Sequence, residues 1–249
     1  MVSATRTVDP LLPADAGTLH GLAYTLWLPP APHPSARAGA VVVHGAGSCK
    51  ESHHDFARAA VALGLAALCF DQRGHGESRG ELDGRAVQDV VAMTGRLRAA
   101  LGGDDAPIAL RGSSMGGYLA ILAAQPAGAR AVVAICPASG SGLARSLRAG
   151  RLGFAADVDG FGALLDGPAL TTVVASLTAP LLIMHAEGDE VVPIAHSRAL
   201  AEALPADAPA GSRLIALPGG HHRSIQHDEE LQAVSLRFIE RALGLPARP

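Results

Sequence analysis

Apolar residues in this chain form short, nearly continuous runs, and longer segments between the runs have apolar residues every third or fourth position. Continuous apolar runs are typical of parallel strands that helices cover on both faces. The intervening spacing is typical of amphipathic helices. Alternation of the two patterns predicts an α/β fold in which crossover helices link parallel strands. The expected parallel strands are residues 40–43, 66–70, 108–110, 131–135, 181–184 and 214–217.

The first apolar segment differs from the later ones, because apolar and polar residues alternate over residues 19–28 and Pro29 and Pro30 follow. This pattern predicts one antiparallel edge strand that ends at the prolines. Two amphipathic stripes predict helices that face the core. The stripes comprise Val87, Val90, Val91, Thr94 and Leu97, and Leu231, Val234, Phe238 and Ala242.

Residues 139–176 interrupt the rhythm of strands and helices and are rich in glycine. Unstructured segments of this length are uncommon inside a compact domain and often form lids or binding features. A chain of 249 residues is long enough for one well-buried core. We therefore expect a single domain over residues 1–249, with a cap or lid inserted at about 139–176.

Composition narrows the classes of partner. With 20 basic and 23 acidic residues the formal net charge is −3, and no basic run is present, so we expect neither nucleic acid nor a membrane as a partner. Cys49, Cys69 and Cys136 are widely spaced, as in proteins of reducing compartments. The first ten residues lack the pattern of a signal peptide, and no uncharged apolar run reaches the roughly 20 residues of a membrane span. A cytoplasmic location is expected.

The sequence Gly112-Ser113-Ser114-Met115-Gly116 lies between an apolar strand run and a run of small apolar residues typical of a helix. A serine at a sharp turn from strand to helix projects its hydroxyl outward, and flanking glycines avoid collisions in the turn. Ser114 is therefore the candidate nucleophile. A second match, Gly76-Glu77-Ser78-Arg79-Gly80, lies in a polar loop with no helix after it, so Ser78 is predicted to be an exposed loop residue.

A serine hydroxyl needs a general base, and the base needs a carboxylate that orients it. Residues 185–190, His-Ala-Glu-Gly-Asp-Glu, follow the expected strand 181–184, and residues 218–223, Pro-Gly-Gly-His-His-Arg, follow the last strand. Loops that leave such strands are the expected place for the partners of the serine.

Taken together, these pieces resemble the α/β-hydrolase family over nearly the whole chain, from about residue 19 to 243. The matching motifs are residues 43–47 (Val-His-Gly-Ala-Gly), residues 70–78, the turn at Ser114, the Gly188-Asp189-x-x-Val192-Pro193 loop, and residues 219–222 (Gly-Gly-His-His). Within the family the chain is similar to small serine esterases and to the serine aminopeptidase-like branch with a reduced cap. The resemblance implies an α/β-hydrolase fold: a mostly parallel twisted sheet of about eight strands with helices on both faces and a small cap insertion.

The resemblance also implies roles for individual residues. Ser114 would be the nucleophile, His222 the general base and Asp189 the orienting acid, in the chain order that this fold uses. His222 is preferred over His221 because it is the second residue after the glycine pair, and Asp189 is preferred over Glu187 and Glu190 because it follows Gly188.

Backbone N–H groups of Met115 and Ala46 would form the oxyanion hole, with Gly47 as a weaker alternative to Ala46. His44 and His75 are expected to have structural roles in their loops.

Four other classes of function compete with a serine hydrolase. A metal hydrolase could use His53-His54-Asp55 and His221-His222, but adjacent histidines point in different directions and no third cluster joins them. A nucleotide-binding interpretation of residues 45–50 fails, because a phosphate-binding loop needs glycine in place of Cys49 and a hydroxyl residue in place of Glu51. A ligand receptor on the same fold, which catalyses nothing, and an oxidase or perhydrolase that needs no cofactor remain open.

The expected function is cleavage of a small or medium carboxylic ester, acyl or aryl, through an acyl-enzyme, with thioesters and peptides or amides as alternatives. Phe154, Phe161, Leu164 and Leu165 of the inserted segment are the expected lining of an apolar substrate pocket. No cofactor and no metal are expected, and the partner is a small-molecule ester. The sequence leaves a homo-oligomer open.

Overall fold

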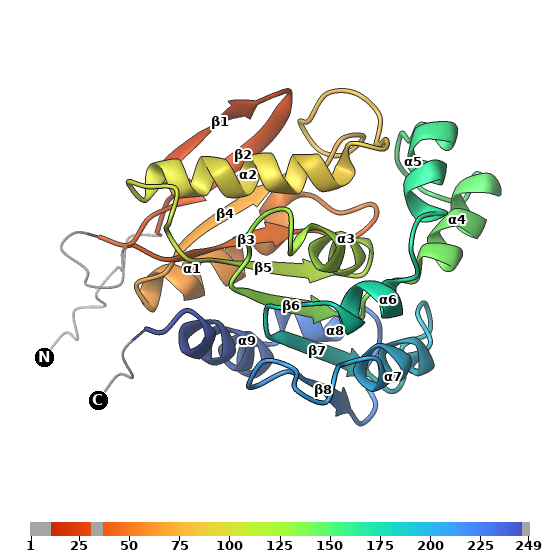
Figure 1. Cartoon of the computed structure of the whole chain (residues 1–249). Helices are drawn as coiled ribbons and strands as arrows, with labels where there is room; N and C mark the ends of the chain where they lie inside the picture. Colours follow the sequence, from red (N-terminus) through yellow and green to blue (C-terminus); the bar gives the residue numbers. More distant parts are fainter. Residues whose placement is uncertain (1–10, 31–36, 246–249) are drawn as a thin grey trace, which may run out of the picture.

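A computed structural model describes residues 11–30 and 37–245. Its core is an eight-stranded sheet with the order β1-β2-β4-β3-β5-β6-β7-β8 (Figure 1). The strands from β3 to β8 are parallel to one another, and β2 pairs antiparallel with both β1 and β4. The strands are β1 (Asp15–Leu19), β2 (Leu22–Trp27), β3 (Gly39–Val43), β4 (Ala66–Phe70), β5 (Ile108–Ser113), β6 (Ala131–Ile135), β7 (Leu181–Ala186) and β8 (Arg213–Leu217).

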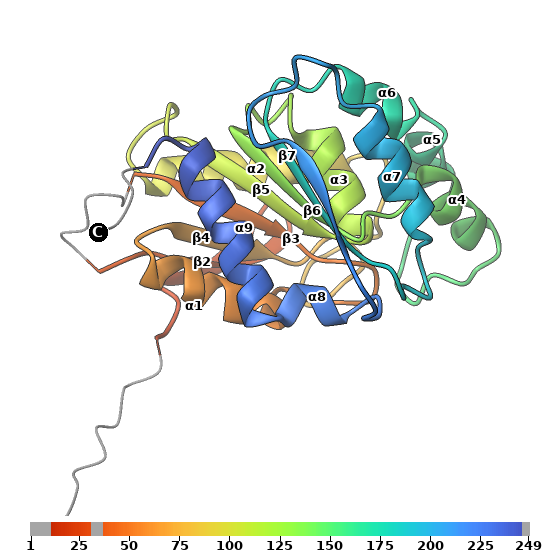
Figure 2. The same ribbon diagram turned by 90° about the horizontal axis from the view of Figure 1, so that it is seen from below.

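Helices cover both faces of the sheet, as the continuous apolar runs predict. One face packs against α1 (His54–Ala62) and α9 (Glu229–Ala242), and the other packs against α2 (Ala86–Ala100), α3 (Met115–Ala123) and α7 (Ile194–Glu202) (Figure 2). Each predicted parallel strand lies within an observed one, which confirms the prediction of parallel strands linked by crossover helices. No helix in the part of the chain that the structure describes is long and apolar enough to cross a membrane.

The antiparallel strand predicted over residues 19–28 is present as β2 (Leu22–Trp27), but the prediction that it lies at the edge of the sheet is wrong. The chain forms a hairpin instead, in which β1 and β2 are joined by His20 and Gly21, both with positive φ (52° and 83°). Two residues with positive φ make the tight turn whose twist matches a pair of antiparallel strands. The short β1 is therefore the edge, and β2 lies inside the sheet with all six residues buried.

The inserted segment between β6 and β7 folds into helices. It contains α4 (Gly140–Arg148), α5 (Val158–Leu165) and α6 (Leu170–Ala175), and Figure 1 shows α4 and α5 beyond the carboxyl ends of β5 and β6. Backbone hydrogen bonds attach the segment to the loop after β4: the N–H of Leu82 donates to the Ala155 oxygen, and the N–H of Asp157 donates to the Leu82 oxygen, each at 2.9 Å. The carboxyl edge of the sheet is thus partly covered by this segment.

Two short helices complete the described structure, η1 (Lys50–His53) before α1 and α8 (Ser224–His227) before α9. Both follow loops at the carboxyl edge of the sheet. The loop before η1 leaves β3, and the loop before α8 leaves β8. Side chains in the loops after β3, β5, β7 and β8 therefore face a common region, because the carboxyl ends of parallel strands share one edge.

Candidate active site

Ser114 occupies the turn between β5 and α3 in a strained backbone conformation, with φ 52° and ψ −118°. Positive φ is uncommon for a residue with a side chain and recurs at active sites. The N–H of Ser114 donates to the Ile135 oxygen at 2.8 Å, and its own carbonyl oxygen accepts from Ala138 at 3.0 Å. The turn is therefore held by the neighbouring strand β6 and the chain that follows it.

The two glycines of the motif are required by close backbone contacts. A Cβ on Gly112 would lie 2.1 Å from the Gly116 oxygen, and a Cβ on Gly116 would lie 2.0 Å from the Val43 oxygen. Real Cβ atoms do not approach this closely, so only glycine fits at either position. The second contact also places the loop after β3 directly against the turn.

Ser78, in the second match to the motif, is structural. Its hydroxyl donates to the Asp71 oxygen at 2.6 Å and accepts from the Ala23 N–H at 2.8 Å. The first bond closes the loop after β4 on itself, and the second ties this loop to β2. The side chain is half-buried rather than exposed as expected, and φ at Ser78 is not positive.

The side chains of the predicted acid, Asp189, and the predicted base, His222, form a hydrogen bond. The imidazole Nδ1–H of His222 donates to Asp189 Oδ2 at 2.7 Å, which leaves Nε2 as the nitrogen that can accept a proton. The Asp189 side chain is 0% exposed and that of His222 is 13% exposed. The acid is thus enclosed, while the base reaches the surface of the site.

Burial alone would raise the pKa of Asp189, but hydrogen bonds to its charged form hold the pKa below the usual range. Both Val191 and Val192 donate backbone N–H groups to Oδ1 at 2.8 Å, and His222 donates to Oδ2. The carboxylate therefore stays ionised and can stabilise an imidazolium.

The rejected alternatives have other partners. Glu187 forms a surface ion pair with Arg198 at 3.0 Å, and Glu190 accepts the backbone N–H of His222 at 3.2 Å. His221 is exposed, and its backbone N–H donates to the Ser224 hydroxyl. Geometry therefore favours Asp189 and His222 over the other candidates in their loops.

The nucleophile and the base both lie close to the end of β6, where Cys136 follows the strand. Ser114 donates its N–H to the oxygen of Ile135, the residue before Cys136. The Cys136 sulfur lies within 4.8 Å of a carboxylate oxygen of Asp189 and of a ring nitrogen of His222. No residue in the described ranges hydrogen-bonds to the Ser114 hydroxyl. Catalytic hydrogen bonds are often long in proteins without substrate, so this geometry is compatible with the expected pair.

The positions of Cys136 and His185 beside the acid, Asp189, were not predicted from the sequence. Burial raises the pKa of the Cys136 thiol to about 12, and Cys136 adopts φ 42°. His185 is fully buried, donates from Nε2 to the Val192 oxygen at 2.9 Å, and has the same nitrogen 3.3 Å from Asp189 Oδ2. Each lies at the carboxyl end of a strand beside the acid, and that position was the only signal in the sequence.

The expected oxyanion loop lies against the nucleophile. A Cβ on Gly45 would lie 3.3 Å from the Ser114 Cβ, so Ala46 follows at the edge of the site. The N–H of Gly47 donates to His75 Nε2 at 3.1 Å, whereas the N–H groups of Ala46 and Met115 have no acceptor among the described residues. This difference favours Ala46 over Gly47 as the second donor to an oxyanion.

Buried histidines hold this loop. His44 donates from Nδ1 to the Gly45 oxygen at 2.7 Å and accepts the Gln72 N–H on Nε2 at 3.0 Å. Burial lowers the pKa of His44 to about 4, and burial also lowers the pKa of His75. Both rings are therefore neutral at pH 7, consistent with structural roles.

The expected substrate-pocket residues separate into two groups. The ring of Phe154 packs at a tilt on that of His75, with 4.1 Å between centroids, beside the oxyanion loop, and Leu164 is half-buried. Phe161 is 0% exposed and Leu165 is 5% exposed, and both belong to the core. The expectation that Phe161 lines the substrate pocket is wrong in this structure, because its ring is fully buried and packs α5 on the core.

The residues that could have supported a nucleotide-binding or metal site form other contacts in the structure. The ammonium group of Lys50 contacts Glu51, Asp71 and Glu77 at 2.6 to 2.9 Å, so it is neutralised within the protein rather than available to a phosphate. His54 binds the Thr25 hydroxyl at 2.9 Å. Among the described residues, the group of three side chains close enough to hold a metal ion is Cys136, Asp189 and His222. Asp189 and His222 already hydrogen-bond to each other.

Comparisons with known proteins agree with this architecture. The model of the serine aminopeptidase family, S33, matches residues 34–158, about half of the chain. The chain therefore belongs to this family of α/β-hydrolases, and membership supports a hydrolase activity. A search of curated proteins found no match.

Solved structures show the same fold at low sequence identity. Est1E from Butyrivibrio proteoclasticus with ferulic acid bound has a TM-score of 0.69 and 22% identity, over 93% of this chain and 98% of that one. A soluble variant of monoglyceride lipase from Saccharomyces cerevisiae gives 0.70 and 16%, over 96% and 97%. Mouse alpha/beta hydrolase domain-containing protein 10 gives 0.66 and 21%, over 92% and 98%.

The contacts at the turn lead to a stability prediction. Replacing Gly116→Ala forces a Cβ into the backbone of β3, so the free energy of unfolding should fall by more than about 3 kcal/mol. The matched control is Gly95→Ala, which is exposed in α2 with no atom within 4 Å of the new Cβ and should raise stability by about 0.5 to 1 kcal/mol. Urea unfolding measures both, and equal effects would contradict the packing.

The neutral His44 predicts loss of stability in acid. The unfolded chain binds a proton at this position below about pH 6.5, whereas the folded chain does so only near pH 4, so falling pH favours unfolding by about 3 kcal/mol from this residue alone. His44→Gln should be less stable than the parent at pH 7, and the difference should narrow by about 3 kcal/mol at pH 4. Urea unfolding at both pH values tests this. The control, exposed His221→Gln, should change the free energy of unfolding at pH 7 by less than about 0.5 kcal/mol.

Proposed function

We propose that the protein is a serine hydrolase that cleaves carboxylic esters of small to medium size through an acyl-enzyme intermediate. The observation that carries the proposal is the hydrogen bond that His222 donates to the buried carboxylate of Asp189, at the same edge of the sheet as Ser114 in its strained turn. Nucleophilic catalysis requires a projecting hydroxyl, a base that can accept the hydroxyl proton, and an acid that orients the base.

In the proposed reaction the Ser114 oxygen attacks the carbonyl carbon of the ester, and His222 Nε2 takes the hydroxyl proton. Asp189 keeps Nδ1 protonated and stabilises the imidazolium. The imidazolium then gives its proton to the leaving alcohol, so an acyl-enzyme remains. A water molecule that is deprotonated by the same imidazole attacks the acyl group and releases the carboxylic acid.

Negative charge on the carbonyl oxygen needs donors that are already in place. The N–H of Met115 lies at the start of α3, and the N–H of Ala46 lies in the loop that packs on Ser114. Because neither has an acceptor in the described structure, each can bind the oxyanion without breaking another bond. Removing such a donor costs on the order of 3 kcal/mol in other serine hydrolases.

The proposed substrate class follows from the surroundings of the turn. Phe154 and the half-buried Leu164 come from the inserted segment, and Phe154 reaches the oxyanion loop through His75. An apolar wall next to oxyanion donors suits the acyl or aryl part of an ester. The monoglyceride lipase and the Est1E structure with ferulic acid suggest the same chemistry by analogy of fold.

A thioester or amide can react at the same triad, and the family description names an aminopeptidase. The competing class is a ligand-binding protein on this fold that catalyses nothing. A panel of p-nitrophenyl acetate, butyrate and decanoate, a thioester and an aminoacyl p-nitroanilide separates these functions. Failure of the wild-type protein to cleave any member and to react with a fluorophosphonate would favour the ligand-binding protein.

Replacing Ser114→Ala should abolish fluorophosphonate labelling and reduce p-nitrophenyl ester turnover by at least about a thousandfold, since the attacking oxygen is lost. Mass spectrometry of the labelled peptide and a spectrophotometric assay measure the two effects. The control Ser78→Ala loses two structural hydrogen bonds and should still be labelled. Parent-like turnover by Ser114→Ala would refute the nucleophile.

Replacing Asp189→Asn should lower kcat by about 10³ to 10⁴, because an amide cannot hold the imidazole in the required tautomer or stabilise its cation. Glu187→Gln, which removes only a surface ion pair, should retain kcat within about twofold. Steady-state kinetics on a p-nitrophenyl ester at neutral pH test both variants. Similar losses in the two would mean that Asp189 has no special role.

A further inference from the structure

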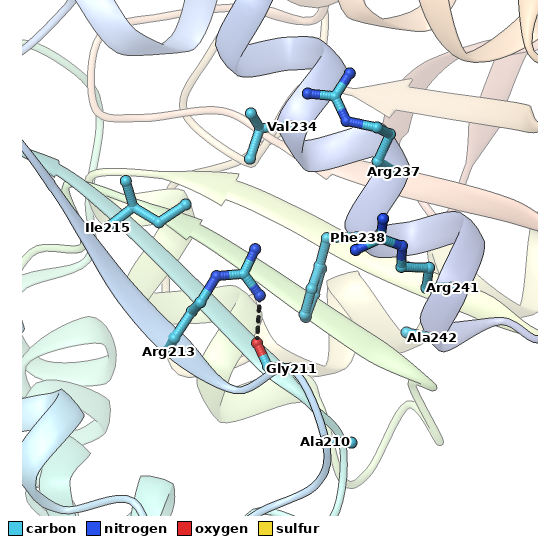
Figure 3. Close-up of a pocket in the computed structure, with 9 residues that line it drawn as sticks. All are labelled: Ala210, Gly211, Arg213, Ile215, Val234, Arg237, Phe238, Arg241 and Ala242. Atoms are coloured by element: carbon cyan, nitrogen blue, oxygen red, sulfur yellow. Dashed lines mark hydrogen bonds between the residues drawn. The ribbon is translucent and has the colours of Figure 1, made fainter.

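A groove lies between the edge strand β8 and helix α9, away from the candidate active site. Its volume is about 570 Å³. Gly211 and Arg213 lie at the amino end of β8, whereas Asp189 and His222 follow the carboxyl ends of β7 and β8. The groove is lined by Ala210, Gly211, Arg213, Ile215, Val234, Arg237, Phe238, Arg241 and Ala242 (Figure 3).

Three guanidinium groups surround this groove. Arg213 extends from β8, and Arg237 and Arg241 lie one turn apart on α9, so they occupy the same side of the helix (Figure 3). In residues 11–30 and 37–245 no carboxylate forms an ion pair with any of the three, and Arg213 donates only to the Gly211 carbonyl oxygen, at 2.9 Å. Three like charges around one groove repel one another, and an anion would relieve the repulsion.

The groove between these cations is apolar. Phe238 is 6% exposed, and Ile215, Val234 and Ala242 are half-buried. Gly211 adopts φ +92°, and a Cβ at this position would lie 3.5 Å from the Phe238 ring. Glycine thus leaves the side of the ring open. Figure 3 shows the ring and the Arg213 side chain on the same side of β8.

The position of Arg241 in the last turn of α9 is favourable for the helix dipole, which explains that residue without a ligand. The dipole does not explain Arg213, which belongs to a strand, or Arg237, which lies earlier in the helix. An apolar floor beside two further guanidinium groups, neither of which has an acidic partner among the described residues, has the chemistry to bind a molecule with an anionic head and an apolar body.

We propose that this groove binds an amphiphilic carboxylate, with its head between the arginines and its apolar chain or ring against Phe238, Ile215 and Val234. A volume of about 570 Å³ is within the range of small-molecule sites. Guanidinium groups suit a carboxylate because they can donate two parallel hydrogen bonds to it. The site is separate from the catalytic edge and does not depend on the proposed hydrolase activity.

Isothermal titration of the full chain with decanoate tests the proposal, with decanol as an uncharged ligand of the same length and acetate as a carboxylate without the chain. Decanoate should bind at least about tenfold more tightly than either. Arg213→Gln and the double variant Arg237→Gln/Arg241→Gln should each weaken decanoate binding by at least about tenfold. Exposed Arg130→Gln, on the loop before β6, should leave it unchanged.

Three results would overturn the proposal. Absence of decanoate binding up to about 1 mM would remove the site. Parent-like affinity in the arginine variants would place decanoate elsewhere, for example beside Ser114. A dimer in light scattering that dissociates in the arginine variants would assign the groove to a second copy of the chain. Circular dichroism and ester turnover of each variant verify that the fold is intact.

Discussion

Ser114 is held at φ 52° because β5 has to turn into α3 within one residue while the loop after β3 packs against the same turn. The turn is possible only because Gly112 and Gly116 have no side chains. Each would otherwise place a Cβ about 2 Å from a backbone oxygen. This constraint fixes the direction of the serine side chain and also brings the Ala46 N–H to the edge of the site. The nucleophile and the proposed oxyanion donors therefore depend on one set of backbone contacts.

The acid side of the site is stabilised by a different balance. Burying an ionised carboxylate is unfavourable unless hydrogen bonds compensate for lost water. Asp189 receives bonds from Val191, Val192 and His222, and the net effect is a lowered pKa despite burial. The two valine N–H groups belong to the same loop as Asp189. This loop therefore stabilises the charged form of its own carboxylate, and no nearby cation is required.

The sequence was most informative where one physical cause dominated. Parallel strands covered on both faces must be apolar throughout, and each predicted run matched an observed strand. The hairpin was not predicted, because the turn at His20 and Gly21 leaves no visible break in the alternation of apolar and polar residues over 19–28. The hairpin depends on two positive φ values, which a histidine followed by glycine indicates only weakly.

Side-chain contacts between distant segments were less predictable. The order of the loops placed Ser114, Asp189 and His222 at one edge of the sheet, but it could not show that Gly47 donates to His75 and that Ala46 has no acceptor. Periodicity could not distinguish a pocket wall from a core residue in the inserted segment either. Phe161 and Phe154 have similar chemistry, yet the packing of α5 buries one ring completely and leaves the other beside the oxyanion loop.

The opposite face of the sheet also supports the loop that carries His222. Arg111, on β5 three residues before Ser114, is 1% exposed, donates to the Gln226 oxygen at 2.9 Å and lies 4.1 Å above the Phe56 ring. A buried guanidinium is stable only with such partners. Gln226 lies in α8, four residues after His222. The strand that presents the nucleophile is thus joined to the helix that follows the base. Movement of either one would break the hydrogen bond of a buried charge, so this contact restrains the distance between the two halves of the site.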